Sequence, residues 1–178
     1  MAASLTGFNS RAFFTFMTKG LLGIAAILAA TSATAGDIIV GIGQDDVFDQ
    51  TETSAVAAVL EYHADPFFDG QIASHGFAGA IYADADSDVF LGFGIASIWR
   101  LGDGPWFVET SIMPGYYDAG SGGTDLGGNW QFRSLIGLGY RFDGGSRISL
   151  ALDHKSNADL EEDNPGSETV MLRYRLDF

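Results

Sequence analysis

The chain has 178 residues, of which 9 are Lys or Arg and 23 are Asp or Glu, so its formal net charge is −14 at pH 7. So acidic a chain is unsuited to binding nucleic acid. It has no cysteine, so its stability owes nothing to disulfides, and 13% aromatic residues with 24 glycines are not typical of a disordered protein.

Residues 1–35 have the pattern of a secretory signal peptide. Arg11 and Lys19 precede the apolar run LLGIAAILAA, and small residues at Ala33 and Ala35 form a cleavage site. The apolar run is about ten residues long, whereas a membrane-spanning helix needs roughly 20. We therefore expect a cleaved signal peptide at 1–35 and a single exported domain at 36–178.

The remaining sequence has the pattern of β-strands. No segment after Ala35 has the caps and periodicity of an amphipathic helix, and eight runs of β composition are separated by turn signals. Tight connections such as LGDGP and DGG alternate with longer, mostly acidic ones, as periplasmic turns and external loops do in outer-membrane barrels. The sequence predicts an all-β fold, an eight-stranded antiparallel transmembrane β-barrel, with strands at about 37–44, 54–64, 74–83, 88–101, 105–117, 129–142, 146–156 and 167–178.

Alternation within the run 129–142 separates two faces. From Trp130 to Phe142 every second residue except Ser134 is apolar, whereas the other parity holds two glycines, two arginines, Gln131 and Leu135. The apolar face is expected to contact lipid, and the other to fill a narrow lumen. The charged residues expected inside the barrel include Arg133, Arg141, Arg173, Glu109 and Asp153, together with Glu61 and its partner His63.

A soluble eight-stranded barrel that holds a ligand is the alternative fold. In that fold the apolar parity would line the interior and the charged parity would face water. The length of the alternation in 129–142 favours the membrane barrel. So does Phe178, because a terminal Phe on such a strand resembles the signal by which outer-membrane barrels are recognised for assembly.

Three polar residues share the lipid-facing parity of the last two runs. Counting forward from Ile148 places His154 and Ser156 on that face, and counting back from Phe178 places Glu168 on it. These runs are consecutive and antiparallel, so residues that flank their connecting loop become cross-strand neighbours. The sequence therefore brings a His, a Ser and a Glu together on the outer wall.

These residue types can form a hydrolytic triad. A Ser hydroxyl needs a base to become a nucleophile, and the His needs an acceptor to fix its tautomer. Ser156, His154 and Glu168 can fill these roles, and Asn157 and Asn164 are candidate donors to the oxyanion. The alternative is that these polar residues merely mark the headgroup interface, where they cost only about 0–1 kcal/mol.

The stretch HKSNADLEEDNPGSE resembles the C-terminal motif of the lipid A 3-O-deacylase (PagL-like) family of outer-membrane enzymes. That motif is His-x-Ser-Asn, then Asn-x-Gly, then a Glu two residues beyond the Gly; it matches His154, Ser156, Asn157, Asn164, Gly166 and Glu168. The resemblance implies a barrel whose Ser-His-Glu triad hydrolyses the ester-linked 3-hydroxyacyl chain at position 3 of lipid A, with the catalytic wall facing the outer leaflet. It places Asn157, Asn164 and Gly166 in supporting roles.

Asp159 departs from that motif, because the family usually has a small residue, often Gly, at this position. A carboxylate beside an oxyanion donor would oppose the developing negative charge, so Asn164 is the stronger candidate donor. The expected partner is lipopolysaccharide in the bacterial outer membrane, the expected chemistry requires no metal or other cofactor, and a homodimer is left open. The competing functions are a non-catalytic structural or surface-interaction barrel and an esterase of outer-leaflet phospholipid.

Overall fold

The computed structural model describes residues 36–48 and 54–177. The signal peptide predicted at 1–35 and the terminal Phe178 lie outside this range, so both stay predictions. Among the described residues no helix is long and apolar enough to cross a membrane.

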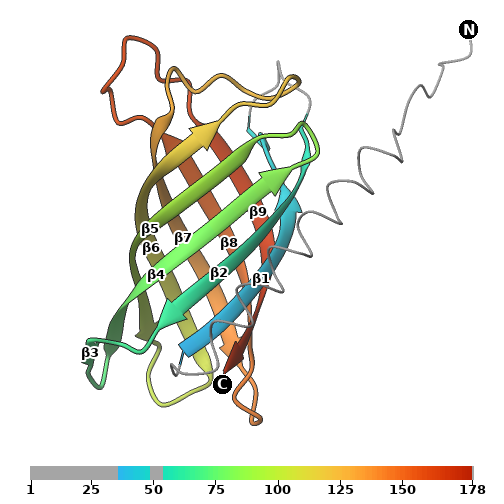
Figure 1. Ribbon diagram of the computed structural model, residues 1–178. Helices are drawn as coiled ribbons and strands as arrows, with labels where there is room; N and C mark the ends of the chain where they lie inside the picture. Colours follow the sequence, from blue (N-terminus) through green and yellow to red (C-terminus); the bar gives the residue numbers. More distant parts are fainter. Residues whose placement is uncertain (1–35, 49–53, 178) are drawn as a thin grey trace, which may run out of the picture. The chain divides into compact units, whose positions relative to one another are not determined.

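The described residues form one closed antiparallel sheet (Figure 1). Each strand pairs with the next along the chain except β2, which pairs directly with β4 instead of β3, and the pairing of β1 with β9 closes the barrel. The strands are β1 (Gly36–Gln44), β2 (Val56–Ala64), β3 (Phe68–Asp69), β4 (Ala73–Asp84), β5 (Val89–Arg100), β6 (Trp106–Asp118), β7 (Trp130–Arg141), β8 (Arg147–Ser156) and β9 (Ser167–Asp177). The predicted eight-stranded barrel is confirmed.

The two-residue strand β3 was not predicted. It extends β4 at one end of the barrel, where Phe68 pairs with His75 and Asp69 with Ser74. Its sequence gives little sign of a strand, because it is bounded by Pro66 and Gly70 and has no alternation of its own. Eight strands therefore make the wall, and β3 is an appendage of the link between β2 and β4.

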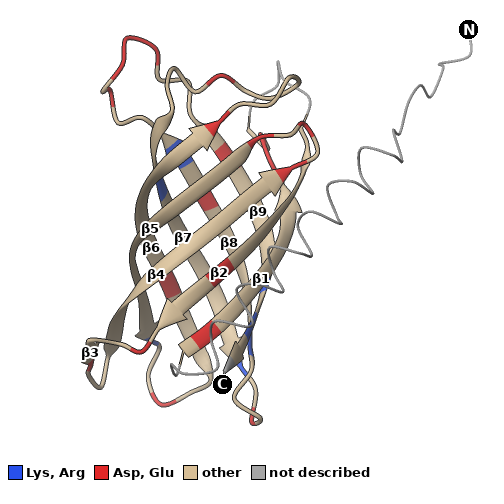
Figure 2. Cartoon of the chain, viewed as in Figure 1, with Lys and Arg blue, Asp and Glu red and all other residues tan. Residues whose placement is uncertain are grey.

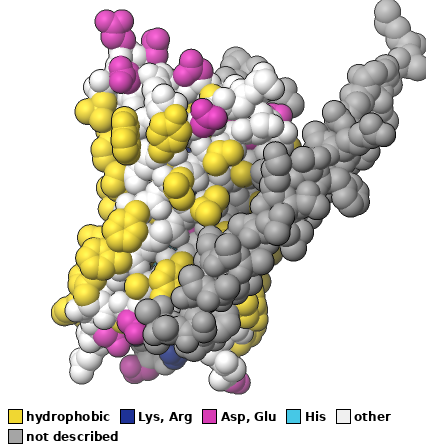
Figure 3. Space-filling view, viewed as in Figure 1, with side chains coloured by type: hydrophobic (Ala, Val, Ile, Leu, Met, Phe, Trp, Pro, Cys, Tyr) yellow, Lys and Arg dark blue, Asp and Glu magenta, His cyan; other side chains and the backbone are white. Residues whose placement is uncertain are grey.

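Apolar side chains cover the outside of the barrel. Along β7 every second residue from Trp130 to Leu138 is exposed or half-buried, and the residues between them are buried. Figure 3 shows apolar side chains spread over the visible outer wall. A water-soluble barrel with an apolar lumen would have the reverse arrangement, so the wall is that of a membrane barrel.

Charged residues fill the interior. Arg133 is completely buried and donates to Glu61 and to Asp153, in each case at 2.8 Å, while Arg173 donates to the second oxygen of Glu61 at 2.8 Å. His63 contacts Glu61 at 2.8 Å, as expected. Arg141 was expected inside but is exposed, because β7 ends at this residue and its side chain leaves the lumen.

The connections differ between the two ends of the barrel. Residues 101–105 and 142–146 make tight connections at the end where β9 finishes, whereas 119–129 and 157–166 form long connections at the other end, where the described residues 45–48 and 54–55 also lie (Figure 1). Acidic residues cluster on these long connections (Figure 2). The loop 157–166 joins β8 to β9, so the predicted triad lies on the outer wall at the long-loop end.

Candidate active site

Strands β8 and β9 place His154 and Glu168 directly opposite each other. Their Cα atoms are partners in the antiparallel register, and both side chains lie on the outward face. His154 Nδ1 lies 2.8 Å from Glu168 Oε1, and the two side chains are 43% and 30% exposed. A carboxylate on Nδ1 favours the tautomer that carries its proton there, which leaves Nε2 free to act as a base.

Ser156 lies two residues beyond His154 on the same face of β8. It is half-buried and pairs across the sheet with Phe132 of β7, on the side of β8 away from Glu168. Within the described part of the chain its hydroxyl makes no hydrogen bond. The structure thus joins His154 to Glu168 and leaves the Ser156 hydroxyl available, an arrangement that tightens in many hydrolases only when substrate binds.

Gly166 packs against the His154 ring, where a side chain would clash with it. The Gly has a φ of 75°, and a Cβ added there would lie 2.8 Å from His154 Cε1. Both the left-handed backbone and the contact favour glycine. Gly166 therefore supports the site by letting the loop pass close against the imidazole.

Asn157 points into the barrel and not toward the wall. Its side chain is fully buried, and its Nδ2 donates to the carbonyls of Leu126 at 3.0 Å and Asp163 at 2.6 Å. Both amide protons are therefore engaged. The backbone N–H of Asn157 donates to Asn164 Oδ1 at 2.9 Å, so Asn157 links the 119–129 and 157–166 loops to the end of β8.

Asn164 is held from both ends of its amide. Its Oδ1 accepts from Asn157, and its Nδ2 donates to Asp159 Oδ1 at 2.9 Å. One N–H of Asn164 therefore remains as a donor. Asp159 has a φ of 60°, which explains why a small residue suits this position, and Asp is among the few non-glycine residues that adopt this conformation readily.

An apolar groove of about 340 Å³ lies on the outer wall near the site. Its sides come from adjacent strands, and Leu152 precedes His154 by two residues on the same face of β8. Ile136 and Leu138 of β7 are the register partners of Leu152 and Leu150 across the groove. An aliphatic chain can lie in this groove with one end near the imidazole.

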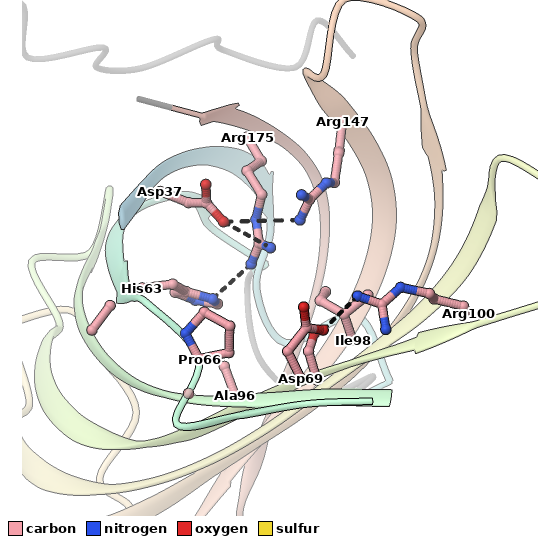
Figure 4. Close-up of a pocket in the computed structure, with 12 residues that line it drawn as sticks. Asp37, His63, Pro66, Asp69, Ala96, Ile98, Arg100, Arg147 and Arg175 are labelled. Atoms are coloured by element: carbon pink, nitrogen blue, oxygen red, sulfur yellow. Dashed lines mark hydrogen bonds and ion pairs between the residues drawn. The ribbon is translucent and has the colours of Figure 1, made fainter. Parts of the chain in front are cut away.

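A polar cavity of about 180 Å³ lies at the opposite end of the barrel (Figure 4). Arg175 donates to His63 Nδ1 at 2.6 Å and pairs with Asp37 at 3.2 Å, and Arg100 pairs with Asp69 at 2.7 Å. The charged side chains that line this cavity are thus paired with one another. Across the residues that the structure describes, no cluster of three His, Asp or Glu side chains could hold a metal ion.

Sequence reasoning missed the buried cluster behind the site. Lys155 lies between His154 and Ser156 but faces the lumen, where its Nζ is 3.3 Å from Asp45 Oδ1 and 3.1 Å from Thr169 Oγ1. The inward parity of Lys155 was visible in the sequence. Its partner Asp45 was not, because it comes from the loop after β1.

The fold and the site together define the class of protein: an eight-stranded membrane β-barrel with a candidate hydrolytic site on its outer wall. The model of the lipid A 3-O-deacylase (PagL) family matches residues 56–177, which include the whole site, and the chain belongs to that family. It is accordingly an ester hydrolase of the outer membrane.

One sequence relative agrees with this assignment, and two solved structures share the fold. The chain is 28% identical over 167 residues to the lipid A deacylase PagL of Bordetella bronchiseptica, covering 88% of this chain and 92% of that protein. The crystal structure of the outer membrane enzyme PagL superposes with a TM-score of 0.65 at 18% identity, over 80% of this chain and 99% of that one. Neisserial surface protein A (NspA) has the same type of fold, with a TM-score of 0.52 at 10% identity, over 83% and 98% of the two chains.

Proposed function

We propose that this protein is a serine esterase that removes the ester-linked 3-hydroxyacyl chain at position 3 of lipid A. The observation that carries the proposal is the hydrogen bond between His154 and Glu168 on the outward face, with Ser156 on the same face of β8. A polar, hydrogen-bonded pair on a lipid-facing wall serves no packing purpose there. It suits a reaction whose substrate lies in the membrane.

In the proposed reaction Ser156 Oγ attacks the carbonyl carbon of the acyl ester while His154 Nε2 takes the hydroxyl proton. Glu168 accepts a hydrogen bond from Nδ1–H and stabilises the imidazolium that forms. The tetrahedral intermediate collapses, the sugar oxygen leaves with the proton from His154, and the acyl chain remains on Ser156. Water, deprotonated by His154, then releases the 3-hydroxy fatty acid.

Asn164 is the proposed oxyanion donor. Its remaining N–H can meet the developing negative charge, and its amide is fixed by Asn157 and Asp159. Asn157 contributes through the position of Asn164, because its own amide protons are engaged. The carboxylate of Asp159 holds the donor in place but opposes the oxyanion electrostatically, so we expect it to moderate the rate.

The apolar groove beside Leu152 supports a long-chain acyl substrate, and it does not distinguish lipid A from phospholipid. Membership of the lipid A 3-O-deacylase family favours lipid A, and the position of the site agrees with it. The site is at the long-loop end of the barrel, which in outer-membrane barrels faces the cell exterior, where the outer leaflet lies. We propose that a cleaved signal peptide at 1–35 directs the export of the protein.

The proposal is tested by mass spectrometry of lipid A and phospholipids from cells that express the wild type or Ser156→Ala. We expect lipid A to lose one hydroxyacyl chain only with the wild type. Unchanged lipid A with altered phospholipids would assign the esterase to phospholipid instead. No change in either lipid would favour the non-catalytic barrel.

A further inference from the structure

Behind the outward-facing site, buried polar side chains meet at one carboxylate oxygen. Asp45 Oδ1 accepts hydrogen bonds from Ser167 Oγ at 2.9 Å and from Thr169 Oγ1 at 2.5 Å, and lies 3.3 Å from Lys155 Nζ. All four residues are buried. The cluster joins the loop that follows β1 to both strands that carry the site.

The order of residues along the strands links this cluster to the proposed triad. On β8 Lys155 lies between His154 and Ser156, and on β9 Ser167 and Thr169 flank Glu168. Because side chains alternate along a strand, Lys155, Ser167 and Thr169 point inward and the residues of the triad point outward. Each residue of the proposed triad is therefore next in sequence to a residue whose side chain contacts Asp45 inside the lumen.

The same loop also reaches the backbone of the site. The N–H of Val47 donates to the carbonyl of Glu168 at 3.2 Å, and the N–H of Asp45 donates to the carbonyl of Ala55 at 2.8 Å. The Lys155 ammonium lies 4.0 Å from the centre of the Tyr82 ring, which restricts it further. These contacts hold β8 and β9 together at the point where His154 must face Glu168.

Electrostatics favours an ionised carboxylate at this position. Burial alone would raise the pKa of Asp45, but attraction to Lys155 and hydrogen bonds from Thr169, Tyr82 and Ser167 outweigh it and leave that pKa below its usual value. The charged form accepts several hydrogen bonds at once, which a neutral carboxyl group does less well. The hydrogen-bonded cluster around Asp45 is therefore most stable when Asp45 is ionised.

We propose that Asp45 is a positioning residue for the reaction, which acts by fixing the backbones of β8 and β9 behind His154, Ser156 and Glu168. This inference rests on the proposed function. Asp45 touches neither the substrate nor the reacting atoms. It sets the spacing between the base, its orienting carboxylate and the nucleophile, and so it acts on the chemical step.

The test compares Asp45→Ala with Glu109→Ala in purified, folded protein assayed on lipid A in detergent. Glu109 is a matched control, because it is also a buried lumenal carboxylate that contacts a hydroxyl and an arginine, Ser149 and Arg173, whereas the partners of Asp45 are Lys155, Ser167 and Thr169. The folded fraction is measured by electrophoresis with and without boiling, and kcat is expressed per folded molecule. Small misplacements of reacting groups cost up to about 100-fold.

We expect Asp45→Ala to lower kcat by about 10- to 100-fold with little change in KM. Glu109→Ala should keep the wild-type kcat per folded molecule. Asp45→Asn should recover part of the loss, because its amide oxygen can still accept from Ser167 and Thr169. If Asp45→Ala does not fold, Thr169→Val serves in its place and should lower kcat without raising KM.

Equal kcat values for Asp45→Ala and the wild type would overturn the positioning role while the proposed function stands. So would an equal loss in the Glu109→Ala control, since the effect would then be general to lumenal carboxylates. A wild type that releases no acyl chain would remove the proposed function first, and the role of Asp45 with it. Measuring wild type and Ser156→Ala alongside separates these cases.

Discussion

Replacing Glu168 with Gln tests whether a carboxylate orients the proposed base. The substitution preserves the shape of the side chain but removes the charge from a hydrogen bond of 2.8 Å to His154 Nδ1. A hydrogen bond to a charged group contributes about 1.5–3 kcal/mol. At 1.36 kcal/mol for each factor of ten in rate, loss of this whole contribution would lower kcat by about 10- to 160-fold, and Gln, which still accepts a hydrogen bond, loses only part of it.

The lower part of that range is expected here. His154 and Glu168 are 43% and 30% exposed, so solvent weakens the pair relative to a buried one. The assay is the release of 3-hydroxy fatty acid from lipid A per folded molecule. Glu162→Gln, an exposed acid in the adjacent loop, makes the same change in net charge and should leave kcat unaltered.

A folded Glu168→Gln enzyme with kcat within about twofold of the wild type would refute this reasoning, since a twofold change is only about 0.4 kcal/mol. The pair would then be an interfacial contact and not part of the reaction. A large loss in Glu162→Gln would point instead to the net charge of the loop.

Two further predictions concern the support of the site. Gly166→Ala should lower kcat at least about tenfold, because the new Cβ would lie 2.8 Å from His154 Cε1 and the left-handed backbone costs a non-glycine residue about 1–2 kcal/mol. Gly144→Ala is the control and should keep the wild-type kcat, because a Cβ there meets nothing within 4 Å. Equal kcat values in the two variants would contradict the steric argument. The lowered pKa of Asp45 means that its ionised form stabilises the fold above the unfolded value of about 3.9 and that this contribution is lost as the pH falls through the folded value. Urea denaturation in detergent measures the free energy of unfolding of the wild type and of Asp45→Asn. The difference between the two should shrink as the pH falls below about 4, and a constant difference would contradict the stabilising role of the ionised Asp45 carboxylate.

Parity along the strands was enough to predict from the sequence that the residues at the centre of the candidate site share one face. Counting residues along two antiparallel strands put His154, Ser156 and Glu168 on one face, because a strand repeats every two residues and a membrane barrel requires an apolar outside. The structure places His154 opposite Glu168, as that count required. The eight strands were also predictable, since each is a separate run between turn signals.

The support around the site could not be predicted in the same way. One partner of Asn157 is a carbonyl of the 119–129 loop, and one partner of Lys155 is Asp45, so both contacts depend on how distant loops fold over the end of the barrel. Alternation within a strand carries no information about such contacts. Arg141 illustrates the limit of parity, because a residue at the end of a strand can keep its parity and still leave the lumen.

Covalent labelling tests directly whether Ser156 is the nucleophile on the outer wall. The folded wild type is treated with a long-chain fluorophosphonate, and its peptides are analysed by tandem mass spectrometry. We predict one phosphonyl adduct, on Ser156, with Ser167 unmodified and labelling strongly reduced in His154→Ala. An enzyme that hydrolyses lipid A but carries no adduct on Ser156, or carries it on another serine, would contradict the account.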